Sequence, residues 1–135
     1  MSGIDLSGRW TGVYFYPVDP QWNPDDALPP TPFSALLLDA GGLVTGTTIE
    51  PDLFSGEGAP DIRATLEGHH DGSTLFFTKF PDGWQTHTID YHGTVDAGGD
   101  SISGDWIIHG EWSGLFRMQR SVAASVRAAT LTAAA

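Results

Sequence analysis

The stretch that decides the fold is Gly8–Tyr16, GRWTGVYFY, in which aromatic residues and a glycine occupy every second position. Because successive side chains of a β-strand point to opposite faces, this segment is predicted to be a strand with one aromatic face, formed by Trp10, Tyr14 and Tyr16. Gly12 leaves a gap in that face. The gap either opens a cavity or leaves space that neighbouring rings fill.

The composition indicates a single domain that is not crosslinked by disulfide bonds. The chain has 135 residues, no cysteine and a formal charge of −11, from 17 acidic and 6 basic residues. Such a charge repels phosphate backbones, which argues against nucleic-acid binding, and tolerates a neutral or cationic small molecule. No apolar run approaches the ~20 residues of a membrane span. The opening MSGIDLSGRW has no basic or apolar signal region, so we expect a cytoplasmic protein away from membranes.

Gly, Asp and Pro divide the chain into short alternating segments, which favours an all-β domain. The expected strands are Gly8–Tyr16, Phe33–Asp39, Leu43–Glu50, Ile62–His69, Thr74–Phe80, Thr88–Val95, Ser101–Ile108 and Trp112–Arg120. Eight consecutive antiparallel strands can close into an up-and-down β-barrel over residues 1–120, and a two-sheet sandwich is the alternative. The alanine-rich tail, 121–135, is expected to be frayed or partly ordered.

Odd- and even-numbered residues of a strand lie on opposite faces, and this parity tests the prediction of a barrel. Residues opposite each other in an antiparallel pair must lie on the same face. Asp71-Gly72 predicts a two-residue hairpin that pairs His70 with Ser73 and places Leu66 opposite Phe77. Later strands are expected to pair Tyr91 with Trp106, Gly93 with Gly104, Gly104 with Phe116 and Trp106 with Gly114. The inward set is then Trp10, Gly12, Tyr14, Tyr16, Phe33, Ala35, Leu37, Ile62, Ala64, Leu66, Leu75, Phe77, Lys79, Ile89, Tyr91, Gly93, Ile102, Gly104, Trp106, Trp112, Gly114, Phe116 and Met118.

Loop lengths differ between the two ends of this barrel. Tight turns (40–42, 70–73, 96–100) close one end, and long connections (17–32, 51–61, 81–87) frame the other. Long loops on a rigid scaffold usually carry binding. The proline-rich segment 17–32 is expected to be extended, with Trp22 as a candidate lid residue.

Gly8-Arg9-Trp10, at the start of the first strand of an eight-stranded meander, resembles the calycin families, the lipocalins and avidins. In lipocalin-like barrels this tryptophan packs at the closed end, and a basic side chain from the last strand lies across it. Arg120 has the matching parity and position. The resemblance implies the barrel and a cavity, and it gives these residues a structural role. Without an alignable biotin-binding set, it does not imply biotin binding.

The candidate ligand-binding residues are inward rings with one inward lysine and one loop tryptophan: Tyr14, Tyr16, Phe77, Lys79, Trp84, Tyr91, Trp106, Trp112 and Phe116. They predict a site for a small apolar or aromatic molecule, provided that the barrel interior is open. If the rings fill the space that the glycines vacate, the interior is a solid core.

Three polar or loop residues leave alternatives open. Lys79 either reaches solvent at the rim, contacts an acidic or carbonyl ligand, or acts as an amine catalyst. Trp84 either packs its loop onto the barrel or stacks on a ligand. His87, in the same loop, is a candidate general base.

No nucleophile elbow, phosphate loop or dinucleotide fingerprint is present, so we expect no cofactor. The histidines His69, His70, His92 and His109 divide between the two ends of the barrel, so we expect no metal site.

Outward apolar residues gather on the first, second, seventh and eighth strands, which are neighbours in a closed barrel: Val13, Phe15, Leu36, Leu38, Ile107 and Leu115. A stripe of this kind predicts a homodimer interface, unless the C-terminal tail covers it.

Three functions remain open at this point. The first is non-enzymatic binding of a small hydrophobic or aromatic molecule. The second is a cofactor-free enzyme, of isomerase, hydratase or cyclase type, acting in the same cavity through Tyr, Lys79 or His87. The third is recognition of a peptide or protein at the long-loop end.

Overall fold

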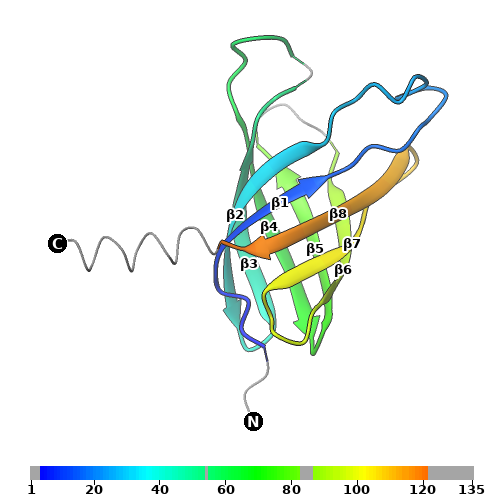
Figure 1. Cartoon of the computed structure of the whole chain (residues 1–135). Coiled ribbons are helices and arrows are strands. Elements are labelled where there is room, and N and C mark those ends of the chain that lie inside the picture. Colours follow the sequence, from blue (N-terminus) through cyan, green and yellow to red (C-terminus); the bar gives the residue numbers. More distant parts are fainter. Residues whose placement is uncertain (1–3, 54, 83–86, 122–135) are drawn as a thin grey trace.

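The computed structural model describes residues 4–53, 55–82 and 87–121. In these ranges, eight antiparallel strands form one closed barrel in which each strand pairs with the next and β8 pairs with β1 (Figure 1). The strands are β1 (Gly8–Tyr14), β2 (Thr31–Ala40), β3 (Leu43–Glu50), β4 (Ile62–Asp71), β5 (Thr74–Pro81), β6 (Ile89–Val95), β7 (Ser101–Ile108) and β8 (Trp112–Arg120). The predicted all-β barrel is confirmed, and the sandwich alternative is wrong.

No helix in the described part of the chain has the length and apolar character that crossing a bilayer requires. The expectation for the alanine-rich tail falls almost entirely outside the described residues.

The turn between β4 and β5 corrects one predicted register. Asp71 pairs with Thr74, so the two loop residues are Gly72 and Ser73, and Leu66 lies opposite Lys79 rather than Phe77. A type I′ turn at Asp71-Gly72 would require positive φ at an aspartate, whereas the observed turn places positive φ, 60°, on Gly72. The slip moves the pairing by two residues, so each side chain keeps the face that was predicted.

The two faces of the barrel wall follow the predicted parity. The buried core comprises the inward residues Trp10, Tyr14, Phe33, Ala35, Leu37, Val44, Ala64, Leu66, Leu75, Phe77, Ile89, Tyr91, Ile102, Trp106, Phe116 and Met118, with Leu6 and Val95 from the ends of the barrel. The predicted pairs of Tyr91 with Trp106 and Gly93 with Gly104 are confirmed, as are both pairs between β7 and β8.

Aromatic rings occupy the space beside three of the inward glycines, Gly12, Gly93 and Gly114. A Cβ atom added at Gly12 would lie 2.3 Å from Cζ of Phe33, and one at Gly114 would lie 2.7 Å from the indole of Trp106. One at Gly93 would lie 3.1 Å from Cζ of Phe116. The gap in the first strand therefore admits a neighbouring ring, and the interpretation that these glycines open the cavity is wrong.

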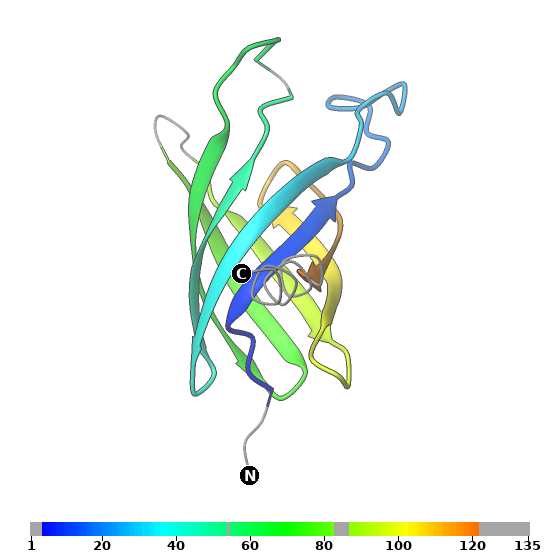
Figure 2. The same ribbon diagram turned by 60° about the vertical axis from the view of Figure 1, so that its left-hand side comes forward.

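Residues 4–7 cross the end of the barrel that lies opposite the long loops (Figure 2). Leu6 is completely buried there, and its carbonyl oxygen accepts a hydrogen bond of 2.9 Å from the indole Nε1 of Trp10. The guanidinium of Arg120 lies over the Trp10 ring, with Cζ 4.7 Å from the ring centroid. The expected stacking of Arg120 across Trp10 is confirmed.

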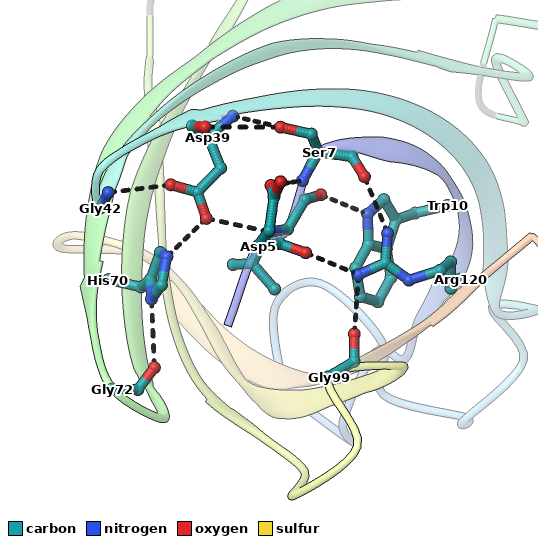
Figure 3. A network of polar contacts seen from close by, with 10 residues as sticks. Asp5, Ser7, Trp10, Asp39, Gly42, His70, Gly72, Gly99 and Arg120 are labelled. Atoms are coloured by element: carbon teal, nitrogen blue, oxygen red, sulfur yellow. Dashed lines mark hydrogen bonds and ion pairs between the residues drawn. The ribbon is translucent and has the colours of Figure 1, made fainter. Parts of the chain in front are cut away.

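Polar side chains fasten this N-terminal segment to the closed end (Figure 3). Asp39 accepts hydrogen bonds from the backbone nitrogens of Leu6 and Gly42, each 2.9 Å long, and pairs with Nε2 of His70 at 2.5 Å. Burial alone would raise the pKa of Asp39, but these donors together lower it from its ordinary value. The Nη atoms of Arg120 donate to the carbonyl oxygens of Asp5, Ser7 and Gly99.

Candidate functional site

A cavity of about 360 Å³ lies at the end framed by the long loops. Its walls combine inward side chains of the strands with residues of the loops that follow β1, β3, β5 and β7. The loops after β1 and β3 extend beyond the strands in Figure 1. The lining residues are Tyr14, Tyr16, Trp22, Glu50, Asp52, Ser55, Ile62, Lys79, Pro81, His87, Ile89, Tyr91, Trp106, Ile108, Glu111 and Trp112. The open space of the barrel thus lies at its mouth, above a filled middle.

The aromatic wall consists of rings that pack against each other. Tyr16 and Trp112 stack with centroids 5.4 Å apart, and Trp106 meets Trp112 edge-on at 5.3 Å. Trp22 adds a further ring at 6.4 Å from Trp112. The Trp106 indole Nε1 donates to the carbonyl oxygen of Phe15 at 2.9 Å, which fixes its orientation. The wall therefore consists of aromatic rings that hold one another in fixed relative orientations.

A buried ion pair forms the polar part of the cavity floor. Lys79 Nζ lies 2.7 Å from Glu50 Oε1, and the two side chains are 6% and 8% exposed. The Tyr14 hydroxyl donates to the other carboxylate oxygen of Glu50. The ammonium also lies over the rings of Tyr14 and Tyr91, at 4.8 and 5.7 Å from their centroids. Of the alternatives for Lys79, extension to the rim is wrong, because Glu50 supplies a partner inside the barrel.

Burial and pairing shift the pKa values of the titratable groups that line the cavity. Burial alone would lower the pKa of Lys79, but neighbouring Tyr91 and Glu50 raise it above its ordinary value. Burial raises the pKa of Tyr91 and of Tyr16. At neutral pH the lysine is therefore an ammonium ion and both phenols keep their protons.

The structure brings most of the predicted site residues together. Tyr14, Tyr16, Lys79, Tyr91, Trp106 and Trp112 line the cavity. Phe77 and Phe116 are buried and pack against Tyr91, at 4.7 and 5.0 Å between ring centroids, without being part of the lining. Trp84 lies outside the described residues. His87 lies on the cavity wall and is exposed.

The loop that carries Trp22 folds back on itself, so the expected extended conformation is wrong. Its organiser is Asn23, which is 2% exposed. The Asn23 side-chain amide donates to the carbonyl oxygens of Tyr16 and Pro17 and accepts from the nitrogens of Ala27 and Leu28. A buried amide satisfied in this way stabilises a compact loop, because each contact replaces a hydrogen bond to water.

Sequence reasoning missed three acidic residues of the lining: Glu50, Asp52 and Glu111. A signal for Glu50 was present. Gly41-Gly42 is a two-residue hairpin signal that pairs Ala40 with Leu43 and hence Leu37 with Gly46. Glu50 shares the parity of Gly46, so it faces inward. Asp52 and Glu111 belong to loops, where parity carries no information.

In the three described ranges, no three His, Asp or Glu side chains gather as a metal-binding group. His109 instead pairs with Asp90 at 2.7 Å. No protein-family model matches the sequence, and comparisons with curated proteins and with solved structures gave no match.

Proposed function

We propose that this protein binds a small apolar or aromatic molecule in the cavity at the mouth of the barrel, without transforming it. The observation that carries the proposal is the cavity of about 360 Å³ walled by Tyr and Trp rings. Ligand sites typically occupy ~300–1,000 Å³ and combine apolar walls with a few polar groups. A volume at the lower end of that range fits a molecule with one or two rings.

The polar groups at the floor favour binding over catalysis. An amine catalyst needs a lysine that loses its proton near neutral pH, whereas the contacts of Lys79 raise its pKa. The buried phenol of Tyr91 stays protonated and suits a role as hydrogen-bond donor to the ligand.

We propose further that the barrel is calycin-like. The support is local: Trp10 lies buried at the closed end, and Arg120 from the last strand crosses its ring.

A homodimer through the outer wall of β1, β2, β7 and β8 remains our proposal for the quaternary structure. Its support is the exposure of Leu36, Leu38 and Leu115, at 45%, 62% and 62%. The strand register divides the predicted stripe into two groups. Leu36 pairs with Arg9 near the start of β1. Leu115 accepts a backbone hydrogen bond from Phe15, which follows the end of β1. Sedimentation velocity on the protein and on its Leu38→Glu variant tests this, and a monomer in both samples would contradict it.

The binding proposal is tested with 1-methylnaphthalene, a neutral two-ring probe, followed by quenching of tryptophan fluorescence and by calorimetry. We expect one molecule per barrel, and weakening by about tenfold in Trp112→Ala, because a large part of the aromatic wall is removed. Phe80→Ala is the matched control, since Phe80 is an exposed aromatic residue outside the lining. Absence of binding, or equal losses in both variants, would contradict the proposal. Native mass spectrometry of freshly purified protein additionally reports any bound mass.

A further inference from the structure

We infer that the molecule bound at the mouth carries a positive charge, as a planar aromatic cation or an alkylated amine. The inference rests on the proposed function and names the ligand class for the same cavity.

The first support is the charge of the loops at the mouth. In the sequence of segments 17–30, 51–61, 82–88 and 109–111, lysine and arginine are absent. The acidic residues of these segments are Asp19, Asp25, Asp26, Asp52, Glu57, Asp61, Asp82 and Glu111. Charge of a single sign around an entrance raises the local concentration of counter-ions and repels ions of the same sign. The entrance therefore attracts cations and disfavours anions.

The second support is the charge within the cavity wall. Glu50, Asp52 and Glu111 line the cavity, and the lining residues described by the structure include one lysine, Lys79, no arginine and one histidine, His87. Lys79 is already paired with Glu50 at 2.7 Å. An anionic ligand would have to separate this buried pair to reach the ammonium, which leaves the carboxylate without its partner. Asp52 and Glu111, which belong to two different loops, are the other acidic residues of the lining.

The third support is the aromatic wall. Tyr16, Trp22 and Trp112 form a continuous group of rings on the cavity wall that Asp52 and Glu111 share. Cations bind over the faces of such rings within ~6 Å of the centroid, and Trp binds them best. The same cavity already holds one cation in this way, because Lys79 Nζ lies 4.8 Å from the centroid of Tyr14.

These observations also orient the ligand. The floor holds the Lys79 ammonium, which repels a second cation, whereas the acidic loop residues lie toward the entrance. Ile62, Ile89 and Ile108 add apolar surface to the wall. We therefore place the charged group of the ligand beside Tyr16, Trp22 and Trp112 and its uncharged part against the isoleucines.

Three probes of nearly equal size separate shape from charge: N-methylquinolinium, its neutral isostere 1-methylnaphthalene, and the anion 1-naphthoate. Calorimetry on the full chain is carried out at about 20 and about 500 mM NaCl, which changes the screening of the acidic groups. We expect N-methylquinolinium to bind about tenfold more tightly than 1-methylnaphthalene at low salt. The preference should shrink at high salt, and 1-naphthoate should bind least.

A double variant, Asp52→Asn with Glu111→Gln, tests the residues. It should lose most of the preference for N-methylquinolinium and keep the wild-type affinity for 1-methylnaphthalene, which also shows that the cavity is intact. Glu57→Gln is the matched control, because Glu57 lies in the same loop as Asp52 and outside the lining. An equal loss of preference in Glu57→Gln would overturn the assignment to Asp52 and Glu111.

The outcomes distinguish the two proposals. If the neutral probe binds as tightly as the cation, or if 1-naphthoate binds most tightly, the charge inference is overturned and the binding function stands. If none of the three probes binds, both are overturned.

Discussion

The two ends of the barrel use similar residues for different purposes. Each end has a buried acidic group with a basic partner, Asp39 with His70 at one end and Glu50 with Lys79 at the other. At the closed end, backbone groups of residues 5–7 cover the polar side chains and accept or supply their hydrogen bonds. At the open end the partners are side chains, and aromatic rings line a cavity. Charged and aromatic residues therefore have a structural role where the chain covers them, and they form a candidate site where a cavity lies above them.

The largest expected effect breaks the closed end. Trp10→Ala removes a ring that is 1% exposed, together with its hydrogen bond to Leu6 and its contact with Arg120. We expect a loss of about 3–5 kcal/mol in the free energy of unfolding, measured by urea denaturation. A loss below about 1 kcal/mol would mean that this end contributes little to stability.

A smaller loss is expected from breaking the ion pair at the open end. Lys79→Met leaves the Glu50 carboxylate buried without its partner, which should cost about 3 kcal/mol in urea denaturation. Adding Glu50→Gln removes the charge and retains an acceptor for the Tyr14 hydroxyl, so the double variant should be more stable than Lys79→Met alone. A double variant that is less stable would contradict this account of the pair.

Acid should affect the closed end through Asp39. Because the pKa of this carboxyl is lowered in the folded protein, its contribution to stability is present above the ordinary value of 3.8 and is lost as the pH falls through the folded value. Urea denaturation between pH about 5 and about 2 should show a shallower decline in Asp39→Asn than in the wild type. Parallel declines would show that other carboxyl groups account for acid sensitivity.

The smallest effect on stability is expected at the mouth. Trp22 is 42% exposed, so Trp22→Ala should change the free energy of unfolding by less than about 0.5 kcal/mol. The same variant should weaken binding of the cationic probe, because one ring of the wall is lost. A large loss of stability would place Trp22 in the structural group with Trp10.

Much of the barrel could be predicted because parity and hairpin signals are local. The aromatic alternation of the first strand and the pairing of Tyr91 with Trp106 follow from such patterns. The position of Arg120 over Trp10 was implied by the resemblance to lipocalin-like barrels, with which the parity of Arg120 agrees. The partner of Lys79 was missed because β3 carries a weak alternation, LVTGTTIE, in which the inward residues include a glycine, a threonine and a glutamate.

The conformation of the loops could not be predicted for a different reason. Loop 17–30 depends on one buried amide, that of Asn23, whose partners include the backbone of its own neighbours. Composition shows that such a segment contains prolines, but it does not show which polar group becomes buried. The acidic side chains of the entrance depend on these conformations, so their gathering around one cavity was visible only in the structure.

The bond between Arg120 and the Ser7 carbonyl has a consequence for folding, because the two residues are 113 positions apart in the chain. The pair at the mouth, Lys79 and Glu50, is separated by 29 positions. Loop-closure entropy must be overcome before contacts between distant residues form. The hydrogen bonds from Arg120 to the N-terminal segment therefore cannot form until the last strand has left the ribosome. Nascent chains that stop before β8 should therefore expose the edges of β1 and β7, and such chains are the ones most prone to aggregate.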